Sequence, residues 1–271
     1  MKHYLSTLTI AGSDSSGGAG IAADIKTMTA LDCLTSLVVT AVTAQDSHGV
    51  HAALPMPPEL VTAQLETVLS ETPPMAVKIG MLPNGAVIHA VAATLRRFPS
   101  CPIVIDPVMV ATNGSRLMDE EAIGTFIDEL LPLATLLTPN IPETACLTGL
   151  PVSTPDELRT AALRLRDMGA RDVLIKGGHR KGTTKDDLLL TGSDFHTFSA
   201  PTLQTTNTHG TGCVLSSAIT AFLAHGLPMP EAVRRAKEFL YLALLRGKDY
   251  DHGPALGTME NGQWTIKNGS Y

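Results

Sequence analysis

The 271-residue sequence predicts an α/β protein with a mainly parallel central sheet covered by helices on both faces. Short apolar runs, typical of buried strands, alternate with longer stretches of helical periodicity along the chain. Polar motifs follow the apolar runs, and in parallel sheets ligands bind beyond the carboxyl ends of the strands. No internal repeat, low-complexity tract or linker divides the sequence, so we expect a single domain over residues 1–271.

The first part of the chain contains two predicted strands, a helix and a small β element. The apolar run 5–11 precedes a Gly/Ser-rich loop, and residues 21–31 have helical spacing. The β-branched run 35–42 predicts a buried strand. The Pro-bounded segment 49–54 predicts a small β excursion that serves as a lid.

The remaining elements continue the alternation. Pro57 and Pro58 suit the first turn of a helix at 58–71, and Thr154 begins an N-cap cluster for a helix at 154–168. Other apolar runs predict short strands, and amphipathic stretches between them predict helices. The strands are expected at 76–79, 103–106, 136–138 and 172–175, the helices at 84–98, 119–131, 211–224 and 230–246, and a hairpin at 186–190 and 194–199.

Composition excludes several functional classes. A hydrophobic content of 44% is sufficient for a large core, while the net charge of −6 and the scattered basic residues argue against a nucleic acid partner. The four cysteines lack a C-x-x-C pair, and the nine histidines lack zinc-ligand spacing. The sequence has neither a secretory signal pattern nor a run of eighteen apolar residues, so we expect a soluble, cytoplasmic protein with no membrane partner.

The segment 207–213 carries the strongest functional signal. Gly210 and Gly212 flank Thr211 where a turn enters a predicted helix, and Cys213 follows. A helix start exposes unpaired N–H groups and favours negative charge, so this segment predicts a phosphate or oxyanion cradle with a thiol at its mouth. A turn followed by a buried structural cysteine is the alternative.

The glycine-rich loop at 12–20 resembles two nucleotide-binding motifs without fitting either. Gly18 lies too far beyond the first strand for a dinucleotide fingerprint, and the Lys-Ser/Thr of a P-loop is missing after Gly17. The loop therefore favours a small-molecule site with Asp24 as a polar anchor. Alternatively, Asp24 is an exposed acid stabilised by the helix dipole.

Other polar residues follow predicted strands at the same sheet edge. Asp106 and Glu143 are acids of the type that a Mg²⁺–phosphate site uses, although each could be a cap or turn residue. Lys176, before two glycines, could neutralise a polyphosphate or be a solvated loop residue. Gln45 offers a donor and an acceptor to a heterocycle, and Met81 suits apolar contact with a ring or the core.

Taken together, these motifs resemble the ribokinase-like superfamily and, within it, the bacterial hydroxymethylpyrimidine/phosphomethylpyrimidine kinases. The resemblance extends from about Leu5 to Arg246, with the motifs in family order. It rests on the segments 8–27, 43–46, 78–82, 106–110, 138–143, 176–179 and 207–213.

The resemblance implies a ribokinase-like three-layer α/β/α sandwich with a small β lid. It also implies an enzyme that uses ATP and Mg²⁺ to phosphorylate a pyrimidine alcohol to its monophosphate and then its diphosphate in thiamine biosynthesis. Pyridoxal kinase activity or a non-catalytic module that binds a ring alcohol are the alternatives. We also expect a homodimer.

Position by position, the resemblance implies three groups of site residues. Cys213 stands where most of the superfamily has an aspartate base, and a thiol with a pKa of about 8.5, lowered at a helix N-terminus, could accept a proton at neutral pH. The pyrimidine site would include Gly12, Asp24, Gln45, Met81 and Val108; the ATP and Mg²⁺–phosphate site Asp106, Asn140, Glu143, Lys176 and Thr211; and the anion hole Gly210, Thr211 and Gly212.

Overall fold

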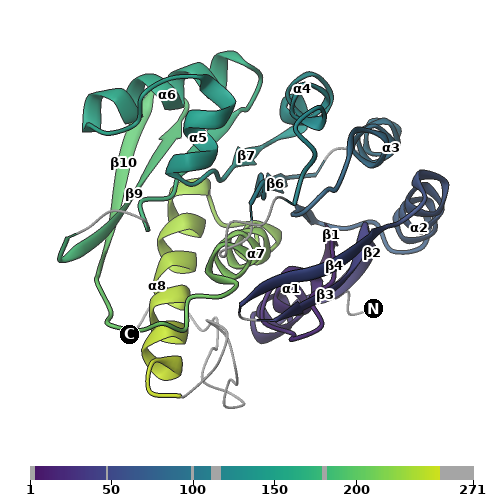
Figure 1. Ribbon diagram of the computed structural model, residues 1–271, viewed down its shortest axis with the longest axis horizontal. Helices are drawn as coiled ribbons and strands as arrows, with labels where there is room; N and C mark the ends of the chain where they lie inside the picture. The colour runs from purple at the N-terminus through teal and green to yellow at the C-terminus, as the bar shows by residue number, and fades with distance from the viewer. Residues whose placement is uncertain (1–3, 47, 99–100, 111–116, 179–181, 251–271) are drawn as a thin grey trace.

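The central sheet is the framework of the computed structural model, which describes residues 4–46, 48–98, 101–110, 117–178 and 182–250 (Figure 1). In this part of the chain the sheet has eight strands in the order β10-β9-β8-β7-β6-β5-β1-β2. All neighbours from β8 to β2 are parallel, whereas β9 runs antiparallel to both β8 and β10. The strands are β1 (Ser6–Ala11), β2 (Leu34–Val39), β5 (Ala76–Ile79), β6 (Ile103–Ile105), β7 (Leu136–Leu137), β8 (Asp172–Ile175), β9 (Thr184–Thr191) and β10 (Asp194–Pro201).

Helices cover both faces of this sheet and produce two apolar cores. Alternate residues of one strand point to opposite faces, so Ile105 of β6 packs in one core and Val104 in the other. One core lies beneath α2 (Pro58–Glu71), α3 (Gly85–Leu95), α4 (Ala122–Thr125) and α6 (Pro155–Asp167), and the other beneath α1 (Gly20–Ala30), α7 (Thr211–Ala224) and α8 (Met229–Gly247). The predicted three-layer α/β/α arrangement is confirmed. No helix in the described ranges is long and apolar enough to span a bilayer.

A separate hairpin stands beside the central sheet. It pairs β3 (Ala41–Asp46) with β4 (Gly49–Pro55), and the register shifts at a bulge between Ala44 and Gln45. The small β element expected at 49–54 is therefore present. The single buried strand predicted at 35–42 is wrong, because β2 ends at Val39 and the chain then enters the hairpin. β2 is also an edge strand with Leu37 39% exposed, and β-branched residues suit edge and buried strands alike.

Two helical segments differ from the prediction. The helix expected at 119–131 is a short α4 followed by a π-helical turn at Phe126–Leu130 and a 3₁₀ turn at Leu131–Leu133. An unpredicted helix, α5 (Ile141–Thr148), begins inside the motif 138–143. It is short and its first turn contains Pro142, so it lacks the long apolar periodicity by which helices are recognised.

Candidate active site

The predicted site residues lie around the carboxyl ends of five strands. Gly12 follows β1, Met81 follows β5, and Asp106 follows β6. Beyond β7 and β8, Asn140 and Lys176 form an isolated parallel bridge that extends the sheet by one residue pair. The carboxyl edge of a parallel sheet is where ligands bind in open α/β folds, so the topology concentrates these residues in the expected place.

The turn Gly210–Gly212 leads into α7 and packs tightly on its surroundings. Gly210 has φ of +79°, and a Cβ atom added there would lie 1.9 Å from the carbonyl oxygen of Gly18. A Cβ atom on Gly212 would lie 3.3 Å from Asp106 Oδ2 and 3.4 Å from Lys176 Nζ. The amide-rich start of α7 therefore adjoins both a carboxylate and an ammonium group.

Asp106 and Lys176 form a largely buried ion pair. Lys176 Nζ lies 2.5 Å from Asp106 Oδ1, and the side chains are 13% and 2% exposed. Ser216 Oγ of α7 donates to Asp106 Oδ2 at 3.3 Å. Burial opposes the charge on Lys176, but Asp106 and Glu143 raise the pKa of its ammonium group above the ordinary value. Lys176 is thus a charged side chain fixed in an ion pair, and it is not the solvated loop residue of the alternative interpretation.

Asn140 and Glu143 form the capping box of α5. Asn140 Oδ1 accepts from the Glu143 amide at 2.8 Å, and Glu143 Oε2 accepts from the Asn140 amide at 2.7 Å. Burial raises the pKa of Glu143, with Lys176 opposing and Asp106 adding to the rise. The cap explains why these residue types stand here, and their predicted contact with Mg²⁺ stays a prediction.

The residues expected to bind the pyrimidine differ in their exposure and in the elements that carry them. Gly12 and Met81 are in contact, since a Cβ atom on Gly12 would lie 2.6 Å from Met81 Sδ. Gln45 is half-exposed on β3, where its backbone bonds Ser15 Oγ at the N-terminal loop. Val108 is half-buried two residues beyond Asp106.

Asp24 is fully buried, so it is not the exposed acid of the alternative interpretation. Both of its oxygens bond Lys78 Nζ, at 3.0 and 2.8 Å. Oδ2 also accepts from Thr9 and Oδ1 from Ser217 of α7. Three neighbouring side chains therefore hold this carboxylate in place, and its expected contact with the ring stays a prediction.

Cys213 also departs from expectation. Burial raises the pKa of its thiol to about 11, although Lys78 lowers it, and Asp24 and Asp106 raise it further. The predicted lowering at the helix N-terminus is therefore wrong, because desolvation and two carboxylates outweigh the positive end of α7 and Lys78. Cys213 is protonated at neutral pH.

Three residues of the site region had no predicted role. Lys78 is a lysine inside an apolar strand, a local sign of a buried charge. Asp14 and His209, from two motifs 195 residues apart, are hydrogen-bonded at 2.8 Å. His179, part of the motif after β8, lies outside the described residues.

The family model described as phosphomethylpyrimidine kinase matches residues 14–258. The chain belongs to this family. Its membership confirms the resemblance that the motifs indicate and the prediction of a kinase.

Two curated relatives are similar to this chain over most of its length. The hydroxymethylpyrimidine/phosphomethylpyrimidine kinase of Rhizobium meliloti is 44% identical over 94% of this chain and 96% of its own length. The thiamine biosynthesis bifunctional protein ThiED of Geobacter sulfurreducens is 46% identical over 92% of this chain. The chain spans about half of that bifunctional protein, 51% of its length.

Solved structures of kinases share the fold. The phosphomethylpyrimidine kinase of Clostridium difficile is 39% identical with a TM-score of 0.77, covering 86% of this chain and 96% of that one. The pyridoxal kinase of Staphylococcus aureus in complex with ADP is 35% identical with a TM-score of 0.84, covering 93% of each chain. Both similarities confirm the ribokinase-like fold of the family.

Proposed function

We propose that this chain transfers the γ-phosphoryl group of ATP to the alcohol of 4-amino-5-hydroxymethyl-2-methylpyrimidine, and then phosphorylates the monophosphate to the diphosphate in thiamine biosynthesis. Family membership supports the reaction and its substrates. The observation that carries the proposal is the convergence of the Gly210–Gly212 turn with Lys176 and Asp106. Phosphoryl transfer needs positioned positive charge and N–H donors above all, and this arrangement supplies both.

Each part of the site has a role in this proposal. Lys176 and the amides of Gly210 and Gly212 stabilise the charge on the transferring phosphoryl group, with Thr211 beside it. The pyrimidine lies on the Gly12–Met81 side, where Met81 Sδ adjoins the backbone of Gly12 and offers an adaptable apolar contact. The amide of Gln45 reads the polar edge of the heterocycle.

The acidic residues fit a magnesium ion that arrives with ATP. Mg²⁺ prefers oxygen ligands and in kinases is held by one or two carboxylates, water and substrate phosphates. The described residues contain no group of three or more His, Cys, Asp or Glu side chains that could hold a metal alone. We therefore assign Glu143, through water, and Asp106 as the protein's contribution, with Asn140 fixing Glu143 through the capping box.

Turnover measurements on defined alcohols test the proposal. ATP consumption is measured with the hydroxymethylpyrimidine, its monophosphate and pyridoxal, each with Mg²⁺ and with EDTA. We expect turnover of both pyrimidines, and loss of it with EDTA. The similarity to the pyridoxal kinase structure favours pyridoxal as the second candidate. Turnover of pyridoxal alone would overturn the pyrimidine assignment, and no ATP use with any alcohol would favour a binding module.

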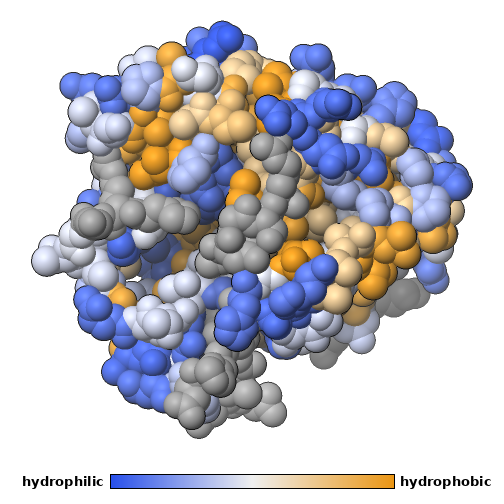
Figure 2. Space-filling model, viewed as in Figure 1, coloured by the Kyte–Doolittle hydropathy of each residue, from blue (hydrophilic) through white to orange (hydrophobic). Residues whose placement is uncertain are grey.

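We also propose that the chain forms a homodimer through the edge strand and hairpin. Several large apolar side chains there are exposed, at 39–66% of their surface: Leu34, Leu37, Val42, Leu54 and, on adjoining α2, Leu60. Figure 2 shows hydrophobic surface on the side where α2 and the hairpin lie. Light scattering tests this: we expect dimer mass for the unmodified chain and monomer mass for Val42→Lys/Leu54→Lys.

A further inference from the structure

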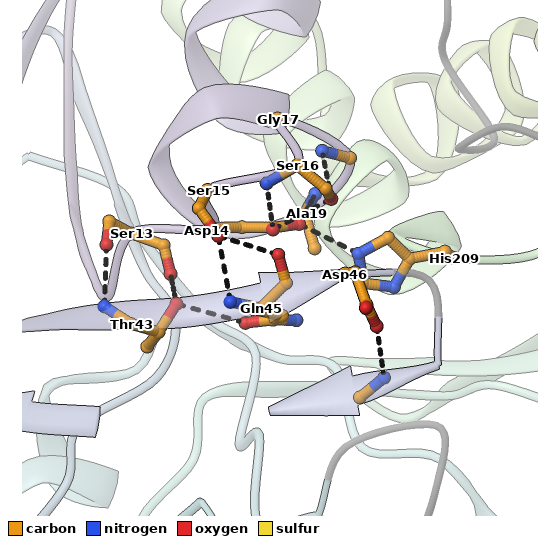
Figure 3. A network of polar contacts seen from close by, with 12 residues as sticks. Ser13, Asp14, Ser15, Ser16, Gly17, Ala19, Thr43, Gln45, Asp46 and His209 are labelled. Carbon is orange, nitrogen blue, oxygen red and sulfur yellow. Dashed lines mark hydrogen bonds and ion pairs between the residues drawn. The ribbon is translucent and has the colours of Figure 1, made fainter. Parts of the chain in front are cut away.

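A buried contact joins two loops that the chain separates by 195 residues. His209 Nε2, in the loop before α7, lies 2.8 Å from Asp14 Oδ2, in the loop after β1. The side chains are 10% and 0% exposed. Figure 3 shows the imidazole pointing into the turn formed by Asp14 to Ala19. This contact fastens the loop that carries the phosphate cradle to the N-terminal loop.

Asp14 is itself held by its own loop. Its Oδ1 accepts from the amide and hydroxyl of Ser16, at 2.9 and 2.8 Å, and its Oδ2 accepts from the Ala19 amide at 2.7 Å. Burial raises the pKa of Asp14, but the hydrogen bonds from His209, Ser16 and Ala19 outweigh it and lower the pKa below its ordinary value. The carboxylate is therefore ionised and fixed, and His209 has a rigid partner.

The cradle begins one residue after His209. Gly210 packs its Cα against the carbonyl of Gly18, in the same loop that Asp14 organises. The His209 contact and this backbone contact together define where the amides of the Gly210–Gly212 turn lie. A misplacement of catalytic groups by about 1 Å can cost about 10²-fold in rate.

The opposite side of the N-terminal loop is bonded to the hairpin that carries Gln45. Ser15 Oγ donates to the Gln45 carbonyl at 2.7 Å and accepts from its amide at 2.8 Å. Ser13 accepts two hydrogen bonds from Thr43, at its Oγ and at its carbonyl oxygen. One loop therefore connects the strand of the proposed ring contact with the phosphate cradle (Figure 3).

We propose that Asp14 and His209 are a positioning pair that sets the distance between the ring-binding side and the amides of the phosphate cradle. The proposal rests on the proposed function for the identity of the two ligands. The pair acts on the transfer step, because it orders the cradle and need not contact either substrate. Its removal therefore lowers kcat and leaves KM for ATP and for the pyrimidine within about threefold.

Three variants and a matched control test the pair. His209→Ala removes the contact, Asp14→Asn weakens it, and His209→Gln keeps a donor that can reach Asp14. The control is His225→Ala: His225 is half-buried, lies just beyond the other end of α7, and like His209 it is hydrogen-bonded through Nε2, here to the Leu31 carbonyl at 2.8 Å. We expect His209→Ala to lose about 10- to 100-fold in kcat, His209→Gln to regain most of it, and His225→Ala to keep wild-type kcat.

Amide hydrogen exchange tests the effect of the Asp14–His209 pair on the order of the loop, without any substrate. We expect faster exchange in a peptide spanning 207–217 for His209→Ala, and no change there for His225→Ala. Wild-type exchange and kcat in His209→Ala, or equal loss in the control, would overturn the positioning role. If the wild-type protein phosphorylates no pyrimidine, but exchange at 207–217 is still faster in His209→Ala than in the wild type, the proposed function is overturned and the Asp14–His209 pair still positions the loop.

Discussion

Asp24 and Lys78 form a fully buried ion pair beneath the candidate active site. Lys78 Nζ lies within 3.0 Å of both carboxylate oxygens, and neither side chain has any exposed surface. Burial favours the neutral amine, but Asp24, Cys213 and Asp106 raise the pKa of Lys78 above its ordinary value. The pair therefore stays charged, and each partner compensates a charge that would be costly alone.

Substitution of Lys78 tests how strongly the pair is coupled. Lys78→Met leaves Asp24 as an unpaired buried carboxylate, so we expect the free energy of unfolding to fall by about 3–5 kcal/mol. Asp24→Leu/Lys78→Met removes both charges and should recover most of the loss. Urea denaturation measures the free energy of unfolding of the wild type, the single variant and the double variant. Lys248→Met is the control, because Lys248 pairs with Asp249 at the surface. Equal effects at Lys78 and Lys248 would contradict the buried coupling.

Gly210 and Gly226 offer a matched comparison at the two ends of α7. Both have positive φ, +79° and +82°, but a Cβ atom would strike Gly18 at Gly210 and meets no atom within 4 Å at Gly226. Gly226→Ala should therefore cost about 1 kcal/mol in stability from backbone strain alone. Gly210→Ala should also displace the cradle and lower kcat about 10²-fold. Unchanged kcat in Gly210→Ala would remove the turn from the transfer step.

The positions of the strands and of most helices follow from local sequence, and the relations between distant residues do not. The helix at 58–71 and the strand at 76–79 were predicted to the residue, since each has clear periodicity or boundaries. Burial of Asp24 depends on α7 packing over α1 and β1, a contact between segments almost 200 residues apart. Local patterns carry no information on such packing, so the sequence alone leaves an exposed Asp24 open as an alternative.

The same limit explains the error at Cys213. The sequence indicates a helix N-terminus at Gly210–Cys213, and α7 does begin at Thr211. It does not indicate that burial raises the pKa of the thiol, or that Asp24 and Asp106 lie close enough to raise it further. A helix dipole can be predicted from one segment, whereas the burial that outweighs it, and the two carboxylates that add to the rise, come from α1, the end of β6 and the packing around them.

Gln45→Ala tests the proposed reader of the pyrimidine. Within the described part of the chain, the side-chain oxygen of Gln45 accepts a long hydrogen bond from Thr43 Oγ1, at 3.4 Å, so the side chain is weakly held and can turn to a ligand. We expect kcat/KM for the pyrimidine to fall about 10- to 100-fold, because a polar edge of the ring loses its partner, with KM for ATP unchanged.

A second glutamine provides the control. Gln64→Ala removes an amide of α2 that bonds the backbone of Val39 in β2 and has no assigned contact with the ring. It should lower the melting temperature and leave pyrimidine kinetics unchanged. If the two variants lose pyrimidine kcat/KM alike, Gln45 has no special role in recognition.

Lys176→Met tests the proposed phosphate contact. Loss of the ammonium group should lower kcat by about 10²–10³-fold. Because Asp106 is then buried without its cation, stability should fall as well, unlike the small effect expected of a solvated lysine. Asp106→Asn/Lys176→Met isolates the effect on stability: stability should recover, while kcat stays low because both side chains belong to the proposed phosphate site. A double variant with recovered kcat would show that Lys176 acts only by compensating Asp106.

Cys213 is tested by the difference between the two phosphorylations. The first acceptor is a neutral alcohol whose proton must leave, so a general base can contribute about 10²–10⁴-fold. The second acceptor is a phosphate monoester that is already mostly ionised at pH 7, with a second pKa of about 6. If the small thiolate fraction of Cys213 supplies this base, Cys213→Ala damages the first step far more than the second, each assayed from its own purified substrate.

The raised pKa of Cys213, about 11, adds a dependence on pH to this comparison. If the thiolate is the base, its fraction increases about tenfold per pH unit below that pKa, so kcat of the first step should rise steeply between pH 7 and 9 while kcat of the second does not. The slope should disappear in Cys213→Ala. Equal losses in both steps, together with parallel pH profiles in the wild type, would assign Cys213 to the packing of the cradle. The alcohol would then lose its proton without a strong base, as a loose transition state permits.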